Sequence, residues 1–521
     1  MPNSSQHDSS STVVMNLGSC SCGSPLDLRQ NRRKFLSMAG LGSLALLTGR
    51  FSFADARGLV NNVSPVAGGE LLMQQNERMA WWREARFGMF VHLGAYSVYG
   101  GEYQGRRTRS MAEWIEHSER IPYNEYEQAA TKFHPTKFSA ERLAGLAKRA
   151  GMKYLVIGTK HHEGFCMWDT QLTDYNIVKW GRFGRDPLKE VAAECQRQGI
   201  KLGFYYSVRD WHHPDWMRYA YLGNPGPNYR GWWGYPASPW TGNRIYDCGC
   251  ESCVADRPIP PNVDPRPTSD VDMNRYLDYM KGQITELLTG YGPVGVMWFD
   301  GQDIEDAKLG RVEEMVATMR KLQPGIIIND RIGPDGTEFG DYGVHEGSIP
   351  GTNVPRDWET CVTSNSSWGF NKFDLNWVDS STMIHWLADT TSKGGNLLLN
   401  VGPDGLGQVP EPAANNLAQV GAWLDVNGAS IYGCGSAGLP QPKWGRITAK
   451  DNMLYLHVFD SPSDAHLIVP KLSKSVDKAY FLVDTNKTPL PVTITDEGLQ
   501  IATPNFQPSH ADTVIAIELR A

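Results

Sequence analysis

Residues 139–162 read SAERLAGLAKRAGMKYLVIGTKHH and contain a helix pattern followed directly by a strand pattern. Leucine and alanine recur at helical spacing after Ser139, a favoured residue at a helix N-terminus, and Gly151 is suited to end that helix. The run from Lys153 to Gly158 is too short and too rich in β-branched residues to be helical. This stretch therefore predicts one helix, a tight turn and one buried strand.

The same order of helix and then strand recurs along the chain. Helices are expected over 187–198, near 273–289, near 310–322 and over 380–391, followed by strands at 200–207, 293–299, 325–329 and 396–401. Nearly continuous apolar strands that alternate with helices indicate a parallel sheet covered by helices. A region of this size favours an α/β fold of the (β/α)8 type, a TIM-like barrel with insertions, over a doubly wound sheet, which stays the alternative.

The two ends of the chain have different patterns. Residues 1–56 contain the pair Arg32-Arg33, a short apolar run and then small residues, which resembles a twin-arginine export signal and indicates a bacterial periplasmic or secreted protein. The barrel domain is expected over 57–433. Short alternating runs at 453–459, 466–469, 479–483, 492–495 and 513–519 then predict an antiparallel β-sandwich over 434–521.

Composition excludes several classes of protein. The 521 residues are 41% hydrophobic and 21% charged, which is typical of a globular chain and not of a disordered one. The formal net charge of −7 makes nucleic acid a poor candidate partner. Outside the signal no apolar run is long enough to span a membrane. The nine cysteines do not form a regular framework, because removing Cys20 and Cys22 with the signal leaves an odd number.

A Pro- and Gly-rich insertion is expected at 223–269. It holds Cys248, Cys250 and Cys253, for which a local disulfide is favoured over half of a zinc site. Its tryptophans either shape the site or pack on a second copy of the chain, so a homo-oligomer stays open. No cofactor and no metal site are expected.

Polar residues follow several of the expected strands. The strand ends lead into His92, His161-His162, Tyr205, Asp300 and Asn329-Asp330-Arg331. The carboxyl ends of the strands of a barrel meet at one face, so these side chains are expected to form one site. Phosphate-binding loops, nucleophile elbows and dinucleotide fingerprints are missing from the sequence. Adjacent histidines on a strand end point in opposite directions, which disfavours a shared metal.

A carboxylate beside an aromatic wall suits attack at the anomeric carbon of a sugar. Asp300 follows Trp298 in the expected strand, and nearby His, Tyr and Arg side chains could hold the sugar hydroxyls. Such an enzyme also needs a second carboxyl group to protonate the leaving oxygen.

Seven stretches of the sequence can be compared with known families: WREARFGMFVHLG at 82–94, EW at 113–114, KHHEGFCMW at 160–168, GFYYS at 203–207, WFDG at 298–301, NDR at 329–331 and WETC at 358–361. Together these stretches resemble α-L-fucosidases of glycoside hydrolase family 29. Their order is the family's order, and the similar region runs from about 79 to 432. The resemblance implies a retaining exo-enzyme with a catalytic barrel and a C-terminal β-sandwich, acting on fucosylated oligosaccharides or glycoconjugates.

Carried over residue by residue, the resemblance makes Asp300 the nucleophile that forms a fucosyl-enzyme intermediate. The positions that match the sugar pocket are His92, Glu113, Trp114, His161, His162, Tyr205, Trp298 and Arg331, with Trp368 near the C5 methyl group. Glu163 stands where the family often has Asp, which is expected to be harmless.

The acid/base residue has two candidates. Glu346 matches the position of several members and is the first choice, and Glu359 is the alternative. Whichever serves must lie about 5–5.5 Å from Asp300 for retention, and the other is expected to be a buried Glu bonded to pocket residues. A fucose-binding protein without activity, a hydrolase of a related sugar and a metal-dependent hydrolase stay open as alternatives.

Overall fold

The structure is a computed structural model that describes residues 65–520, apart from 109, 120, 122, 217–271, 302–307, 334–338, 461–465, 471, 473 and 504–510. The expected export signal and the insertion at 223–269, with Cys248, Cys250 and Cys253, lie outside the described residues. The chain divides into two units, and the elements that build the site belong to the unit that contains Met79–Ala521. No helix in the described part is long and apolar enough to cross a membrane.

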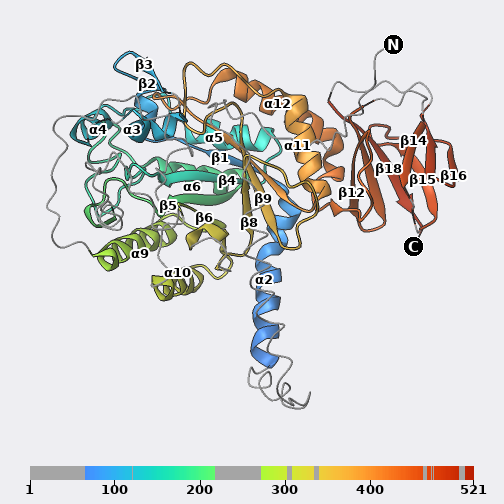
Figure 1. Cartoon of the computed structure of the whole chain (residues 1–521), viewed down its shortest axis with the longest axis horizontal. Coiled ribbons are helices and arrows are strands. Elements are labelled where there is room, and N and C mark those ends of the chain that lie inside the picture. The colour runs from blue at the N-terminus through green and yellow to red at the C-terminus, as the bar shows by residue number, and fades with distance from the viewer. Residues whose placement is uncertain are drawn as a thin grey trace, which may run out of the picture. The chain divides into compact units, whose positions relative to one another are not determined.

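Eight parallel strands form the central sheet (Figure 1). They are β1 (Phe87–Val91), β4 (Tyr154–Lys160), β5 (Lys201–Ser207), β6 (Val296–Asp300), β7 (Ile327–Ile328), β8 (Gly343–Glu346), β9 (Trp358–Thr363) and β10 (Asn396–Val401). Each pairs with the next in this order, except that β7 and β8 are joined only by a bridge between Asn329 and Tyr342, and β10 pairs with β1. This cyclic order confirms the predicted (β/α)8-type barrel.

Helices lie between most of these strands, as the sequence predicts. Those after β1 with ten or more residues are α5 (Ala140–Arg149), α6 (Pro187–Gln198), α9 (Met273–Gly290), α10 (Leu309–Leu322), α11 (Ser380–Ser392) and α12 (Glu411–Asn427). The others are α2 (Pro65–Ala85), α3 (Ile115–Ser118), α4 (Tyr123–Ala130) and the 3-10 helices η2 (Ala95–Val98), η3 (Ala112–Trp114), η5 (Asp330–Ile332) and η6 (Gly428–Ser430). No helix separates β8 from β9, because residues 347–357 form only turns, bends and irregular structure.

Local signals explain where the predicted helices begin and end. The hydroxyl of Ser139 accepts the backbone N–H of Arg142 at the start of α5, and Asp186 does the same for Lys189 at the start of α6. Gly199 ends α6 with a φ of 74°, a left-handed conformation that glycine adopts without strain.

Two apolar layers lie on opposite sides of the sheet. Alternate residues of each strand face the helices or the barrel interior, and the interior layer includes Phe90, Val156, Trp298 and Leu398. Trp82 of α2 joins this interior layer and packs on Tyr342, with ring centroids 4.8 Å apart. The barrel is therefore a packed core and not a channel.

The C-terminal part contains two antiparallel sheets. One contains β11 (Gly435–Ser436), β12 (Gly445–Lys450), β13 (Met453–Val458), β15 (Val476–Phe481) and β18 (Thr513–Leu519), and the other β14 (His466–Pro470), β16 (Val492–Thr495) and β17 (Gly498–Ala502). A short hairpin of β2 (Glu102–Tyr103) and β3 (Arg106–Arg107) lies outside these sheets. The two C-terminal sheets share one apolar cluster. This confirms the predicted antiparallel sheets, although β11, β12 and β17 were not predicted from the sequence. The boundaries at 57 and 433 stay predictions.

The seam between β7 and β8 depends on Asp341. Its carboxylate accepts the backbone N–H of Ile328 at 2.9 Å and two contacts from Arg320, each at 2.9 Å. Its own N–H donates to the carbonyl of Ile328 at 2.7 Å. A buried side chain thus supplies hydrogen bonds where the strands are too short to form a ladder.

Asp341→Ala should lower the free energy of unfolding by about 2–4 kcal/mol, because it leaves Arg320 and a buried N–H without their partner. The measurement is chemical denaturation of the full chain. Asp278→Ala is the matched control, because Asp278 also pairs with an arginine, Arg311, but is 69% exposed. The control should change stability by no more than about 0.5 kcal/mol, and an equally small effect at Asp341 would contradict its role at the seam.

Candidate active site

The structure brings the predicted strand-end residues together at one end of the barrel. His92 directly follows β1, His161 and His162 follow β4, and Tyr205 lies in β5; Asp300 ends β6, Arg331 lies in η5 after β7, and Glu346 ends β8. Ring centroids of His92 and His161 are 5.6 Å apart, and those of His161 and Tyr205 are 5.5 Å apart. The carboxyl ends of the strands therefore form one polar site.

The carboxylate of Asp300 accepts three hydrogen bonds from neighbouring residues. Oδ1 accepts the backbone N–H of Gly301 and Nη1 of Arg331, each at 2.9 Å, and Oδ2 accepts the hydroxyl of Tyr205 at 3.0 Å. Burial acts to raise the pKa of Asp300, but the positive charge of Arg331 and the hydrogen bonds outweigh it and hold the pKa below 3.8. Asp300 is therefore an ionised carboxylate at neutral pH.

Arg331 connects Asp300 to Glu346. Its Nη1 lies 2.9 Å from Oδ1 of Asp300 and 2.8 Å from Oε2 of Glu346. Two oxygens that contact one nitrogen cannot be farther apart than the sum of those distances. The nearest oxygens of the two carboxylates are therefore no more than about 5.7 Å apart, which is closer to the ~5–5.5 Å spacing typical of retaining glycosidases than to the ~6.5–9.5 Å of inverting ones.

The three imidazoles of the site are buried and uncharged. Burial lowers the pKa of His92 and of His161 to about 3, and lowers the pKa of His162 well below its usual value. Neutral imidazoles can both donate and accept a hydrogen bond, as sugar hydroxyls do. Among the described residues, no three His, Cys, Asp or Glu side chains are grouped to hold a metal.

Aromatic rings surround these polar groups. Trp114 packs edge-on against His162 with ring centroids 5.1 Å apart, and Trp368 lies 5.4 Å from His92. Trp298 stacks on Tyr205 at 5.6 Å. Rings of this kind offer an apolar face on which the C–H side of a sugar can lie.

Glu113 is a buried carboxyl group on the same side of the barrel. Its Oε2 accepts the backbone N–H of Gly369 at 2.8 Å and the hydroxyl of Ser367 at 3.3 Å. Its Oε1 is also buried and has no partner within the part of the chain that the structure describes. Burial raises the pKa of Glu113 to about 7, and the unpaired oxygen is available to a substrate hydroxyl.

Glu359 lies at the other end of the barrel from Asp300. It is the second residue of β9 and pairs in register with Asn396, the first residue of β10. Its oxygens accept the hydroxyl of Tyr154 at 2.6 Å and the indole N–H of Trp298 at 2.9 Å. This is the buried, hydrogen-bonded position expected for the carboxyl group that is not the acid/base.

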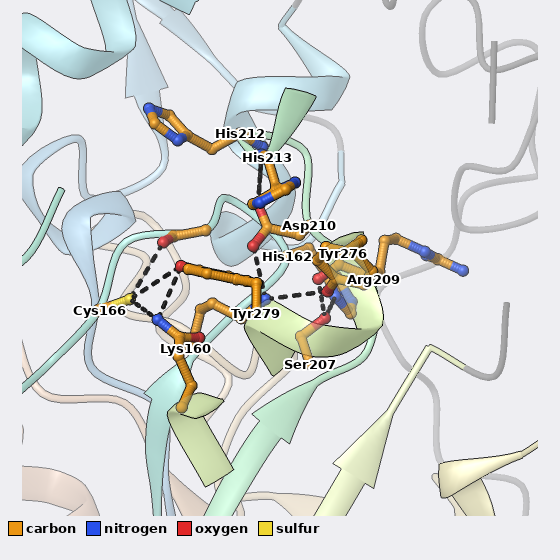
Figure 2. Close-up of polar contacts among 12 residues, drawn as sticks. Lys160, His162, Cys166, Ser207, Arg209, Asp210, His212, His213, Tyr276 and Tyr279 are labelled. Carbon is orange, nitrogen blue, oxygen red and sulfur yellow. Dashed lines mark hydrogen bonds and ion pairs between the residues drawn. The ribbon is translucent and has the colours of Figure 1, made fainter. Parts of the chain in front are cut away.

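Sequence reasoning did not identify a group of residues whose hydrogen bonds hold His162 and the loop after β5 in place. Figure 2 shows Ser207 between His162 and Arg209, and Lys160 paired with Asp210. Lys160 is fully buried, and its Nζ lies 2.7 Å from Oδ2 of Asp210. Asp210 also accepts the backbone N–H groups of His212 and His213, which fixes the loop after β5. One feature of the sequence could have indicated this group: Lys160 lies at the end of an apolar run, and a lysine buried there needs an acidic partner such as Asp210.

The chain is similar to known proteins over the region that forms the barrel. A family model described as Alpha-L-fucosidase matches residues 70–429. An α-L-fucosidase from Dictyostelium discoideum is 25% identical over 417 residues, which cover 75% of this chain and 79% of that relative. The structure of α-L-fucosidase isoenzyme 1 from Paenibacillus thiaminolyticus is 35% identical with a TM-score of 0.70, and the match covers 86% of this chain and 100% of that one.

A second solved structure bears on the chemistry. It is a GH29 α-L-fucosidase from Bacteroides thetaiotaomicron, described as a trapped covalent intermediate in complex with 2-fluoro-fucosyl fluoride. It is 28% identical with a TM-score of 0.71, and the match covers 85% of this chain and 96% of that one.

Glu359 should make the protein less stable as the pH rises. Burial raises its pKa from 4.5 to about 7, so between these values the folded chain keeps a proton that the unfolded chain releases. The free energy of unfolding therefore falls across this window. Glu359→Gln removes the titration, and its stability relative to the wild type should improve by roughly 3 kcal/mol between pH 4.5 and pH 8.

Urea denaturation of both proteins at several pH values makes this measurement. The free energy of unfolding of the variant should still fall with pH to some extent, because burial also raises the pKa of Glu113 to about 7 and of Glu163 to about 8. Parallel pH profiles for the two proteins would show that Glu359 is ionised in the folded state.

Proposed function

The chain belongs to the α-L-fucosidase family, and we propose that Asp300 and Glu346 are the nucleophile and the acid/base of its reaction. It is a retaining glycoside hydrolase that releases terminal α-L-fucose through a covalent fucosyl-enzyme intermediate. The contact of both carboxylates with Nη1 of Arg331 carries the assignment, because it sets the short spacing that a retaining pair requires. A sugar-binding protein without activity would need neither carboxylate.

In the first step Asp300 attacks the anomeric carbon, and the bond from that carbon to the leaving oxygen breaks. Glu346 gives its proton to the leaving oxygen, so the aglycone departs as an alcohol and Asp300 becomes an ester. In the second step a water molecule attacks the same carbon, Glu346 takes a proton from that water, and the ester bond to Asp300 breaks. Two inversions at one carbon leave the configuration unchanged.

Arg331 supports both steps through its two contacts. Before reaction it stabilises the ionised form of Asp300, which is the form that can attack. When Asp300 becomes an ester it loses its charge, and Glu346 is then the only one of the two carboxyl groups that can pair with Arg331. The guanidinium therefore stays next to the residue that acts as the base in the second step.

The remaining pocket residues are proposed to hold the sugar. The buried neutral imidazoles of His92, His161 and His162 and the unpaired oxygen of Glu113 face hydroxyl groups. Trp114, Trp298 and Trp368 offer apolar surface to the ring and its methyl group. Glu359, already bonded to Tyr154 and Trp298, is proposed to be structural.

Asp300→Asn should lower turnover of 4-nitrophenyl α-L-fucoside by about 10³-fold or more, because an amide is not a nucleophile. The amide oxygen of asparagine can still accept from Arg331 and the backbone N–H of Gly301, and its NH2 group can donate to the hydroxyl oxygen of Tyr205, so folding should be preserved. NMR of the wild-type reaction should show α-L-fucose as the first product. First appearance of the β anomer would remove Asp300 from the role of nucleophile.

Azide separates the two acid/base candidates. Glu346→Gln should slow natural fucosides far more than aryl fucosides with acidic phenol leaving groups, which need little protonation, and azide should restore activity by attacking the intermediate. Glu359→Gln is the matched control and should show neither the leaving-group effect nor the rescue. Azide rescue of Glu359→Gln instead of Glu346→Gln would reverse the assignment.

We also propose that this is a bacterial protein exported with residues 1–56 as its signal. The arginine pair at 32–33 ahead of a short apolar run supports this. Replacing Arg32 and Arg33 together by lysine should leave the protein in the cytoplasm of a bacterial host, as measured by fractionation and immunoblotting. Arg50→Lys is the control and should be exported, and equal export of the double variant would exclude this pathway.

A further inference from the structure

We propose that Ser207 and Asn400 are positioning residues that hold His162 and His92 in the tautomer protonated on Nδ1. Each imidazole then has an unprotonated Nε2, which can only accept a hydrogen bond. This inference deepens the proposed function, because it states that these two histidines recognise sugar hydroxyl groups through the hydroxyl hydrogens.

The tautomer of His162 follows from a chain of three groups. The hydroxyl of Ser207 lies 2.6 Å from the backbone carbonyl oxygen of Arg209 and 2.6 Å from Nδ1 of His162 (Figure 2). A carbonyl oxygen can only accept, so the single hydroxyl hydrogen of Ser207 must point to Arg209. The Ser207 oxygen is therefore an acceptor toward His162, and Nδ1 must carry the imidazole proton.

The tautomer of His92 follows from the orientation of Asn400. The side-chain N–H of Asn400 donates to the backbone carbonyl of Trp368 at 2.8 Å, and its Oδ1 lies 2.7 Å from Nδ1 of His92. Turning the amide over would place its oxygen against the carbonyl of Trp368, and two acceptors at that distance repel. Nδ1 of His92 must therefore carry the proton as well.

Both rings are neutral, which completes the assignment. His92, His162 and their partners Ser207 and Asn400 are all buried, and burial is the main cause that lowers the pKa of each histidine. A neutral imidazole has one proton, so a proton on Nδ1 leaves none on Nε2. Ser207 ends β5 and Asn400 lies in β10, so rigid strands position both acceptors.

Nε2 of His162 faces the nucleophile. It lies 3.6 Å from Oδ2 of Asp300, which is longer than a hydrogen bond and fits two acceptors facing one another. The buried Oε1 of Glu113 lacks a donor among the described residues. A sugar hydroxyl is both donor and acceptor, so its hydrogen can satisfy a group that no protein donor reaches. The pocket is thus matched to a polyhydroxylated ligand with free hydroxyls.

The tautomer can be measured directly in the full chain. In a sample labelled with 15N-histidine, two-bond 1H–15N correlation spectra distinguish a protonated from an unprotonated ring nitrogen. The signals of His162 are assigned by their loss in His162→Gln, and those of His92 by their loss in His92→Gln. We expect Nδ1 to be protonated and Nε2 unprotonated in both rings of the wild type. Protonation of Nε2 in either ring would overturn the proposal for that ring.

Ser207→Ala tests the positioning role. It should change the His162 pattern toward protonated Nε2 and lower kcat/KM by about 10- to 100-fold, as is typical for loss of a group that orients a site residue. Ser207→Thr keeps the hydroxyl group and should keep the wild-type tautomer. Ser430→Ala is the control for stability, because Ser430 of η6 also has a buried hydroxyl that donates to a backbone carbonyl, that of Asn427 at the end of α12. It should leave the His162 signals and kcat/KM unchanged.

The two proposals can fail separately. An active wild-type enzyme with Nε2 of His162 protonated would refute the tautomer assignment and leave the proposed function intact. An inactive wild type with the Nδ1-protonated pattern would support the assignment and refute the proposed function. A Ser207→Ala variant that keeps both the wild-type tautomer and wild-type kcat/KM would show that Ser207 has no positioning role.

Discussion

The site depends on one shared guanidinium group. Two carboxylates that approach within hydrogen-bonding distance of one atom would, without a cation, be forced to share a proton. Arg331 contacts both Asp300 and Glu346 and so lets the nucleophile be ionised while the second carboxylate stays within reach of the same bond. The spacing of the two carboxylates and the charge of the nucleophile both follow from this contact.

The position of Arg331 is in turn set by the two residues before it. The side chain of Asn329 exchanges two hydrogen bonds of 2.8 Å with the backbone of Phe299 in β6, next to Asp300. Asp330 accepts the backbone N–H of Val344 in β8, at 3.2 Å. Of the three residues after β7, Asn329 therefore binds β6 and Asp330 binds β8. Arg331 bridges the carboxylates at the ends of these two strands. Side chains here replace the backbone ladder that β7, with two residues, is too short to provide.

The sequence predicted correctly those elements whose ends are set by neighbouring residues in the chain. Capping residues and a left-handed glycine placed α6 over 187–198, and apolar runs placed the strand ends where the site was found. It was insufficient for β8 and β9, which have no helix between them and no clear apolar period. For that reason the sequence could not place Glu359 at the beginning of a strand, at the end of the barrel opposite Asp300. Asn400, and the role of the strand-end residue Ser207 in orienting His162, were not predicted, because a residue that orients a histidine has no sequence pattern of its own.

The positive charge of Arg331 is the main difference between two carboxyl groups of the same pocket, the partly exposed Asp300 and the buried Glu113. Asp300 and Glu113 both lose water on burial, which by itself favours the protonated form. Asp300 contacts Arg331, and its pKa is held below 3.8. Glu113 accepts only neutral donors, a backbone N–H and a hydroxyl, and its pKa rises to about 7. At neutral pH the group beside the cation is therefore a charged nucleophile, whereas the group without one is suited to bind a neutral hydroxyl.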